Sequence, residues 1–462
     1  MRTCLLDTTL REGELYRLLK LSRKIAIARS LLEVGIRRIE LTLAYPPRTS
    51  PEDLKMLISL LNDYDAESVI HCRAYREDVE SASKYDVWGI AVYIALSKIH
   101  ARYKFGEEDR GELTRRLIDA IELSKESGFK YIRATIEDAS RIYLEEGLDE
   151  LVKTINVLRD AGATIISLPD TSGLMTPPIV RDFIKDLKRC VSAQISAHFH
   201  NDYGYASANT VEAILAGVDE AHVSILGIGD RNGIADLYEV VAPLIDIHRV
   251  ELGVKRESLK DLYSTFSKLT GIRIPARHPL SDEARTIRAG VHQSMTIKAP
   301  EGYIPKGKLH HDFTSILYEP TPFISKRLIE EILGECNLSH EKIKELTERI
   351  GSEASRMSGR LPITRLQHIL SEYLSPTARK KLEKFFGLER AYVLLKSGPS
   401  LSIDSFIEEV SRWSEVEHIE EVYGCFDLIL TVKTNPGIEE FVEKLNKLFG
   451  NGIEKISILT LR

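Results

Sequence analysis

The sequence lacks a long hydrophobic run, a large excess of one charge and any close pairing of its cysteines. No apolar stretch approaches the roughly 18–20 residues that span a bilayer, and Asp7 and Arg11 interrupt the short apolar start, which is not a signal peptide. The formal net charge of −6 is mixed in sign along the chain and provides no basic face for nucleic acid or a membrane surface. The five scattered cysteines form no CxxC motif, which is typical of reduced thiols. We therefore expect a cytoplasmic protein with no nucleic-acid and no membrane partner.

The chain of 462 residues is too long for one ordinary domain, and its first half alternates short β-branched runs with helical patterns. Strands that alternate with helices over about 250 residues predict parallel βαβ units, and eight such units predict a TIM (β/α)8 barrel over residues 1–253. A doubly wound open sheet is the alternative, but it usually has a glycine-rich first turn, and here that turn is charged. The strands are expected at Cys4–Leu10, Arg38–Ala44, Ser68–Arg73, Gly89–Ala95, Tyr131–Glu137, Ile165–Asp170, Gln194–His200 and Ala221–Leu226.

Two further regions are expected after the barrel. Residues 254–388 change to helical patterns around an irregular, proline-rich loop at 299–322, which predicts a helical linker region. Residues 389–462 follow the order β-α-β-β-α-β, which is the order of a ferredoxin-like α+β domain.

The strongest local motif is I-S-A-H-F-H at residues 195–200. Side chains alternate along a strand, so His198 and His200 project to the same side, at the end of the seventh strand where TIM-barrel chemistry is found. Two imidazoles there suit a divalent metal that takes one or two oxygen ligands besides. Two hydrogen-bonded histidines at a strand end are the alternative.

Arg11 and Glu12 follow the first strand and are expected at the same end of the barrel. Alone they would indicate a surface ion pair, but together with the histidines Glu12 completes a two-His, one-carboxylate set. Such a set leaves positions open for a chelating 2-oxo acid, whose ketone oxygen the metal would polarise while Arg11 donates to it.

The fifth strand places Arg133, Thr135 and Glu137 on one face and apolar residues on the other. Inward polar groups are costly unless something binds them, so Arg133 and Thr135 indicate a carboxylate clamp and Glu137 an acid/base or orienting group. The alternative is an internal ion pair between Arg133 and Glu137.

Several motifs together resemble the 2-isopropylmalate/homocitrate synthase family over residues 1–375. The resemblance implies a TIM barrel, a divalent metal and a Claisen-type condensation of acetyl-CoA with a 2-oxo acid, followed by thioester hydrolysis. The motifs are D-T-T-L-R-E-G-E at 7–14, L-P-D-T-S-G at 168–173, H-F-H-N-D-Y-G at 198–204, G-I-G-D-R-N-G at 227–233 and A-G-V-H at 289–292.

The resemblance assigns roles to individual residues of the barrel. Glu12, His198 and His200 match the metal ligands of the family. Arg11 matches the arginine on the 2-oxo group, and Thr171 matches the threonine that holds the 1-carboxylate.

The resemblance also implies a homodimer or a higher homo-oligomer. His292 and Tyr303 match the pair that reaches the active site of a neighbouring subunit and helps to deprotonate acetyl-CoA. Glu137 matches an acidic residue proposed to assist there.

The identity of the 2-oxo acid depends on a few positions. Glu at position 12, and Arg133 with a hydroxyl at Thr135, resemble the homocitrate synthase branch, which uses 2-oxoglutarate. A buried cation would also reject an isopropyl group, because its charge would stay unpaired. The family's substrate-binding histidine in the third strand falls on Val69, and His71 on the same face is taken as its substitute. The alternatives are 2-isopropylmalate synthase and citramalate synthase.

Two features bear on feedback inhibition by lysine. Ala91 stands where some homocitrate synthases carry an aspartate that lets lysine compete in the active site, so lysine's second amino group would lack a partner there. Residues 389–462, with Gly424 to Asp427 closing a strand pair, resemble the amino-acid-sensing domain of the leucine-responsive regulator family. We expect lysine to inhibit through this domain; assistance in oligomerisation alone is the alternative.

The sequence leaves the metal and one other functional class open. The ligand set accepts magnesium, manganese, zinc, cobalt or iron. Acyl-CoA lyase or aldolase cleavage on the same barrel is less favoured, because those relatives lack the region of His292 and Tyr303. A non-catalytic amino-acid sensor is the alternative from a different class, although no helix-turn-helix is evident.

Overall fold

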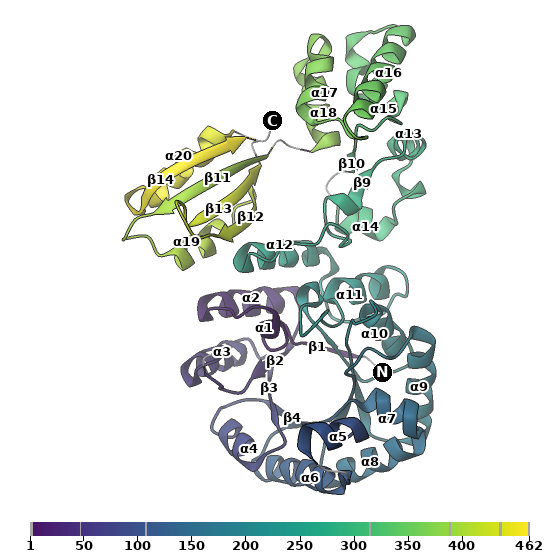
Figure 1. The fold of residues 1–462 in the computed structure, drawn as a ribbon, viewed down its shortest axis with the longest axis vertical. Coiled ribbons are helices and arrows are strands. Elements are labelled where there is room, and N and C mark those ends of the chain that lie inside the picture. Colours follow the sequence, from purple (N-terminus) through teal and green to yellow (C-terminus); the bar gives the residue numbers. More distant parts are fainter. Residues whose placement is uncertain are drawn as a thin grey trace. The chain divides into compact units, whose positions relative to one another are not determined.

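The computed structural model describes residues 3–46, 48–106, 109–313, 316–387, 390–433 and 437–460. The chain divides into two compact units, residues 1–262 and 263–462. Within the described part of the first unit, eight parallel strands pair in sequence order and close because β1 also pairs with β8 (Figure 1). The predicted TIM barrel is confirmed. Its strands are β1 (Cys4–Asp7), β2 (Arg38–Thr42), β3 (Glu67–Arg73), β4 (Gly89–Ala95), β5 (Tyr131–Glu137), β6 (Ile165–Asp170), β7 (Gln194–Phe199) and β8 (Glu220–Val223).

Helices lie outside the ring of strands and cover it (Figure 1). Most carry one buried apolar stripe; α9, for example, buries Val180, Phe183 and Leu187. The helices are α1 (Gly13–Tyr16), α2 (Leu21–Val34), α3 (Pro51–Asp63), α4 (Arg76–Ala82), α5 (Lys98–Phe105), α6 (Arg110–Glu126), α7 (Ala139–Glu146), α8 (Leu148–Ala161), α9 (Pro177–Cys190), α10 (Ala206–Leu215) and α11 (Leu237–Asp246).

The first strand is shorter than predicted. It ends at Asp7 and not at Leu10, because the Asp7 carboxylate accepts hydrogen bonds from the backbone N–H and the hydroxyl of Thr9, at 2.9 and 3.1 Å, and turns the chain. This turn brings Arg11 and Glu12 over the carboxyl end of the barrel instead of extending them away from it.

Local sequence signals explain where the helices begin and end. Ser50 accepts a hydrogen bond of 3.0 Å from the Asp53 N–H and is followed by Pro51, so helix α3 begins there. Helix α2 ends at Gly35 in the left-handed conformation (φ 102°), where an added Cβ would meet the Gly253 carbonyl oxygen at 2.4 Å.

An apolar cluster joins five of the barrel strands. Leu6, Val69, Ala91, Tyr131 and Ile165 form a cluster of buried residues. Val69 and Ala91 therefore pack as interior hydrophobic residues at the positions where the family resemblance places a histidine and an aspartate.

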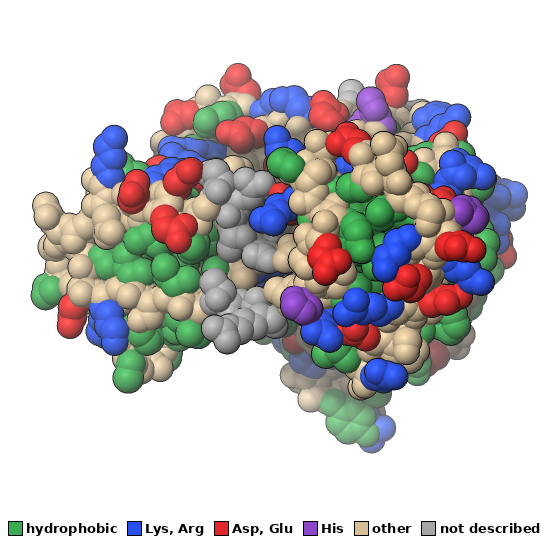
Figure 2. All heavy atoms as spheres, turned by 90° about the horizontal axis from the view of Figure 1, so that it is seen from above, with side chains coloured by type: hydrophobic (Ala, Val, Ile, Leu, Met, Phe, Trp, Pro, Cys, Tyr) green, Lys and Arg blue, Asp and Glu red, His purple; other side chains and the backbone are tan. Residues whose placement is uncertain are grey.

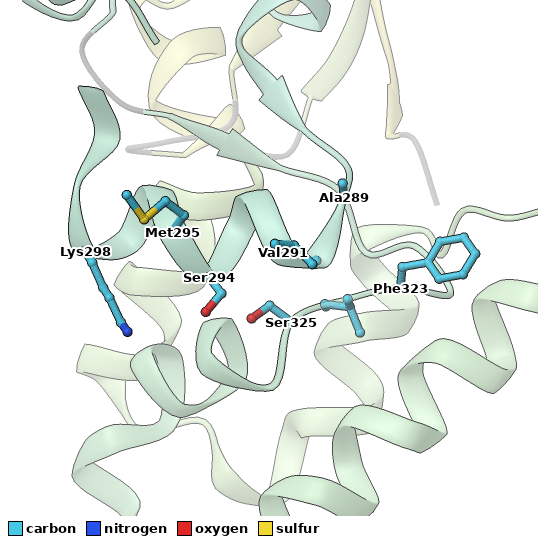
Figure 3. A pocket seen from close by; sticks show the side chains of 9 residues that line it. Ala289, Val291, Ser294, Met295, Lys298, Phe323 and Ser325 are labelled. Carbon is cyan, nitrogen blue, oxygen red and sulfur yellow. The ribbon is translucent and has the colours of Figure 1, made fainter. Parts of the chain in front are cut away.

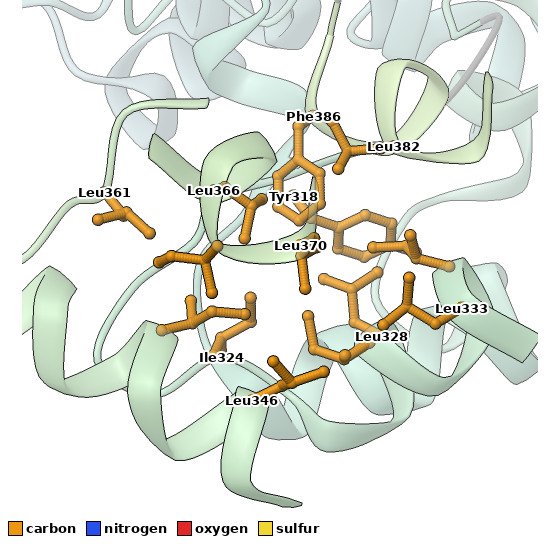
Figure 4. Packing of buried hydrophobic residues seen from close by; sticks show 14 of the residues in the cluster. Tyr318, Ile324, Leu328, Leu333, Leu346, Leu361, Leu366, Leu370, Leu382 and Phe386 are labelled. Atoms are coloured by element: carbon orange, nitrogen blue, oxygen red, sulfur yellow. The ribbon is translucent and has the colours of Figure 1, made fainter. Parts of the chain in front are cut away.

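The second unit begins within helix α12 (Leu259–Thr270) and continues with a helical region. Its core is a cluster that includes Leu328, Leu346, Leu366, Leu370 and Leu382, drawn from four helices (Figure 4). The proline-rich stretch predicted as a loop holds the short helix α14 and strand β10. The elements are β9 (Thr286–Ile287), α13 (Gly290–Lys298), α14 (Lys306–His311), β10 (Leu317–Tyr318), α15 (Lys326–Leu333), α16 (His340–Arg356), α17 (Ile363–Leu370) and α18 (Pro376–Phe386).

The last part of the chain forms an antiparallel sheet of order β12-β13-β11-β14 with two helices, as the ferredoxin-like prediction requires. Along β11, Ala391, Val393 and Leu395 are buried in the core under the helices, whereas Tyr392 and Leu394 face the other side. Hydrophobic side chains gather on this domain, at the left of Figure 2. The elements are β11 (Arg390–Ser397), α19 (Ile403–Val410), β12 (Val416–Glu421), β13 (Leu428–Lys433), α20 (Ile438–Phe449) and β14 (Ile453–Thr460).

The domain divisions at 253/254 and 388/389 stay predictions, and residues 388 and 389 lie outside the described residues. Among the described residues, no helix has both the length and the hydropathy needed to cross a bilayer.

Candidate active site

Glu12, His198 and His200 meet at the carboxyl end of the barrel. Each offers one ligand atom, and these atoms lie within 4.8 Å of one another. All three residues are at most 9% exposed, and Nδ1 of His200 is a buried nitrogen without a hydrogen-bond partner. An orphaned imidazole nitrogen beside a buried carboxylate fits a divalent cation, so the donor set suits the predicted metal.

The loop at residues 227–233 packs against this cluster. A Cβ added to Gly229 would lie 2.8 Å from Cγ of Glu12, and one added to Gly233, at φ 80°, would lie 1.9 Å from the Gly227 carbonyl oxygen. Gly229 therefore lets the loop approach the carboxylate closely, and Gly233 lets the loop fold back on Gly227.

Arg11 is fixed by three contacts. Its Nε donates to Oε2 of Glu40 at 2.5 Å, its Nη1 donates to the Glu12 carboxylate, and its backbone carbonyl accepts from Arg48. The guanidinium thus lies beside the candidate metal ligands with its direction determined from both sides.

Burial keeps the imidazoles of this region neutral. It lowers the pKa of His71, His198, His200 and His222 below the usual value. Neutral imidazole is the form that binds a metal. His71 stacks on Tyr93 with ring centroids 4.6 Å apart, which orients it toward the cavity it lines.

Arg133 is paired inside the barrel, but with different partners from those considered above. Its Nη2 donates to Glu40, and its Nη1 lies 2.9 Å from Nε2 of His222 and 3.8 Å from Glu220. Burial alone would raise the pKa of Glu40, but Arg11 and Arg133 hold that pKa well below its usual value. The internal Arg133–Glu137 pair is absent from the described contacts, and that alternative was wrong.

Glu137 pairs with helix α5 instead. Both of its carboxylate oxygens accept from Nζ of Lys104 at 2.8 Å, and Nδ1 of His100 lies 3.8 Å away. Thr171 accepts a hydrogen bond of 2.9 Å from the Asp138 N–H, which leaves its own hydroxyl hydrogen to be donated.

A cavity of about 490 Å³ joins these groups. It is lined by each predicted barrel residue, namely Arg11, Glu12, His71, Arg133, Thr135, Glu137, Thr171, His198 and His200. A single concave, largely polar site thus contains residues from strands far apart in the sequence.

Sequence reasoning missed four residues of this interior. Glu40 and His222 pair with Arg133, Glu220 anchors the amino end, and Ser167 lines the cavity. Polar residues alternating with buried apolar ones in R-I-E-L-T and E-A-H-V carry the same signal that identified Arg133 and Thr135. These strands are short, so the pattern is weak in each of them.

His292 and Tyr303 lie in the second unit, where their rings stack with centroids 3.9 Å apart. A cavity of about 770 Å³ beside helix α13 is lined by Val291, Met295 and Phe323, and the first and last of these are more than three-quarters exposed (Figure 3). Helix α13, which carries His292, therefore also presents exposed apolar side chains.

Comparison with known proteins identifies the family. Residues 2–265 match the HMGL-like family model. The chain is 34% identical over 364 residues to 2-isopropylmalate synthase of Methanocaldococcus jannaschii, which covers 77% of this chain and 65% of that protein. It is 28% identical to homocitrate synthase of Saccharolobus islandicus over 463 residues, or 96% of each. The chain thus spans just under two thirds of the first relative and nearly all of the second.

Among solved structures, HMG-CoA lyase of Bacillus subtilis aligns with a TM-score of 0.52 at 19% identity, over 60% of this chain and 96% of the lyase. At this identity the likeness shows the fold. Since the family model spans more than half of the chain and includes every candidate metal ligand, the chain belongs to the HMGL-like family.

Proposed function

We propose that this chain condenses acetyl-CoA with a 2-oxo acid and releases CoA, and that 2-oxoglutarate is the preferred acid. The observation that carries this proposal is the cavity in which Glu12, His198 and His200 meet beside Arg11. The names of the relatives, which include homocitrate synthase and 2-isopropylmalate synthase, agree with it.

The condensation has three steps before hydrolysis. A base takes a proton from the acetyl methyl group, the carbanion forms a bond to the ketone carbon, and the ketone oxygen takes up a proton. Water then cleaves the thioester to give free CoA and a carboxylic acid.

Arg11 and Thr171 bind and orient the 2-oxo acid in this proposal. Arg11 donates to the ketone oxygen as that oxygen gains negative charge, because its guanidinium is already fixed by Glu40 and Glu12. The Thr171 hydroxyl, whose oxygen accepts from Asp138, donates its hydrogen to the 1-carboxylate. A divalent ion held by Glu12, His198 and His200 supplies Lewis-acid polarisation of the ketone when bound.

Glu137 and the second-unit pair handle the proton in this proposal. Glu137 lines the cavity, and His292 and Tyr303 of a second copy complete the base. The exposed Val291 and Phe323, which line a cavity beside helix α13, favour docking of this surface on another subunit, which supports a homodimer.

The preference for 2-oxoglutarate rests on Arg133, Thr135 and His71, which line the deep part of the cavity. The competing substrates are 2-oxoisovalerate and pyruvate, which 2-isopropylmalate and citramalate synthases use. Free CoA thiol is measured with each acid in turn. Faster release with 2-oxoglutarate supports the assignment, and faster release with either competitor replaces it.

The sensor alternative is tested in the same assay. CoA release that EDTA abolishes and Mg²⁺, Mn²⁺, Zn²⁺ or Co²⁺ restores identifies a metal-dependent enzyme. No release with any 2-oxo acid and any of these ions would favour a non-catalytic amino-acid sensor.

We further infer that lysine inhibits through residues 389–462. Ala91 is fully buried among apolar residues and offers lysine no anion in the barrel, while the sheet face of Tyr392 and Leu394 lies opposite its covering helices. Deleting the domain would bare α12, because Ser267 contacts His418 at 3.4 Å and Lys268 donates to the Trp413 carbonyl. The sharper test is Leu394→Asp: inhibition by lysine should disappear while CoA release without lysine is retained, and unchanged inhibition excludes this face.

A further inference from the structure

We propose that Ser167 determines specificity by hydrogen-bonding the far end of the 2-oxo acid, and that the group bound there carries oxygen. The inference rests on the proposed condensation and deepens it, because it names the residue that recognises the group at the end of the acid farthest from the ketone. Ser167 is 1% exposed and lies on β6 with its side chain lining the cavity.

The strand register gives the depth of Ser167. Pro169 pairs with His198, and Ser167 pairs with Ser196 on β7 and with Thr135 on β5. Ser167 and Thr135 are therefore side by side, two residues deeper in the barrel than His198, which is roughly 7 Å along the strands.

Hydrogen-bonding atoms without partners belong to residues at this depth and to Arg133, two residues deeper on β5. Among the described residues, Oγ of Ser167, Oγ1 of Thr135 and Nε of Arg133 are buried without a hydrogen-bond partner, and all three residues line the cavity. A buried polar group without a partner is costly, so three such donors at one end of a cavity indicate a ligand that accepts from them.

Arg133 alone does not explain a preference for a dicarboxylate. Its Nη2 donates to Glu40 and its Nη1 contacts His222, so its charge is already matched by a carboxylate within the barrel. Its Nε–H is buried without a partner. The hydroxyls of Ser167 and Thr135 then supply most of the hydrogen bonds to the ligand. Removing Arg133 would leave Glu40 without this charge partner and disturb the site for every substrate.

The depth fits a short chain that ends in oxygen. From the ketone carbon of 2-oxoglutarate, two methylenes and a carboxylate extend about 5 Å, which reaches from the level of His198 toward Ser167. The methyl group of pyruvate extends only about 1.5 Å, and the branched end of 2-oxoisovalerate accepts no hydrogen bond. Both would leave the three donors unpaired.

The test compares two acids of the same shape. In 2-oxo-5-methylhexanoate, two methyl groups replace the two distal carboxylate oxygens of 2-oxoglutarate. The ratio of kcat/KM for 2-oxoglutarate to that for its apolar mimic is measured for the wild type, Ser167→Ala and Ser124→Ala. Ser124 is the matched control, since it is a buried serine of helix α6 that donates to the Ala120 carbonyl and does not line the cavity.

Ser167→Ala should lower this ratio about 10- to 100-fold, as expected for a hydrogen bond to a charged acceptor, while Ser124→Ala leaves it unchanged. A ratio within twofold of wild type in Ser167→Ala overturns the inference, even if both rates fall. A purely structural role would lower both rates together.

CoA release by the wild type distinguishes failure of the proposed condensation from failure of the inference about Ser167. If the wild type releases no CoA, the binding of the two acids to the Mn²⁺-loaded protein is measured by calorimetry. If 2-oxoglutarate binds more tightly than its mimic, and Ser167→Ala weakens that binding while Ser124→Ala does not, the role of Ser167 is supported even without the proposed reaction. Equal binding of both acids overturns it.

Discussion

The two ends of the barrel interior treat their polar groups differently. At the amino end, Glu220 accepts from Arg38 at 2.5 Å, from Tyr131 at 2.9 Å and from Ser196 at 2.9 Å. Toward the carboxyl end His200 keeps a buried polar atom without a partner, and so do Thr135 and Ser167 in the cavity that opens there. Both ends are buried and both are polar, so burial alone does not identify function. The presence or absence of partners separates a structural network from a binding site.

The electrostatics follow the same division. Burial would raise the pKa of Glu220, but its contact with His222 and the neighbouring arginines hold that pKa well below its usual value. The amino end is thus a closed set of compensated charges. The carboxyl end has donors without partners and neutral imidazoles, which suit the proposed metal and substrate.

The largest expected effect breaks the carboxyl end. Glu12→Gln should lower CoA release at least about 10³-fold, because it removes the anionic ligand of the proposed metal. The control is Glu52→Gln at an exposed position of helix α3. Release within tenfold of wild type in Glu12→Gln, with metal still bound, contradicts the proposed ligand set.

The second prediction breaks the amino end. Glu220→Gln should lower the free energy of unfolding by about 3 kcal/mol, because it leaves buried cations without their counter-charge. Glu67, the more exposed partner of Arg38, is the control, and Glu67→Gln should cost less than about 1 kcal/mol. Urea denaturation measures both. Equal costs would mean that the buried network is no more structural than a surface pair.

The third prediction concerns pH. Folding lowers the pKa values of four histidines, namely His71, His198, His200 and His222. Below about pH 6.5 these histidines therefore bind protons in the unfolded chain but stay neutral in the folded chain. The free energy of unfolding of the metal-free protein should therefore fall as the pH decreases from 7 to 5, by up to about 1.4 kcal/mol per pH unit for each histidine.

Asp7 acts in the opposite direction. Burial raises its pKa to about 7, so the stability that its protonated form provides is lost as the pH rises through 7. Urea midpoints at several pH values should show a steeper pH dependence in Asp7→Asn and a shallower one in His71→Asn. A flat profile in the wild type would contradict neutral buried histidines.

The smallest expected effect sharpens the comparison. Thr135→Val should change the free energy of unfolding by less than about 1 kcal/mol, because the Thr135 hydroxyl has no partner to lose. Thr8→Val should cost about 1.5–3 kcal/mol, since the Thr8 hydroxyl donates to buried Glu40 at 2.6 Å. Thermal or urea denaturation measures both variants. A larger loss of stability in Thr135→Val than in Thr8→Val would show that Thr135 is structural.

Much of the fold could be predicted because the signals are local. Strands β4, β5 and β6 have the predicted bounds, since each is a β-branched run flanked by turn residues. The end of β1 was misplaced because a hydrogen bond from the Thr9 backbone N–H to the Asp7 carboxylate overrides the apolar pattern. The metal triad was predictable for a related reason: barrel strands present their carboxyl ends at one rim, so His198, His200 and Glu12 had to converge.

The partners of the buried charges could not be predicted. Arg133 is an inward residue by alternation, but its choice of Glu40 over Glu137 depends on which strands are neighbours across the barrel and on the depth of each side chain. By itself, the sequence determined the barrel, the order of the C-terminal elements and the face on which each polar residue lies, because periodicity is a property of the chain. Only the tertiary structure decided which groups are paired and which stay open at Ser167 and Thr135, because closing the barrel sets the distances between residues far apart in sequence.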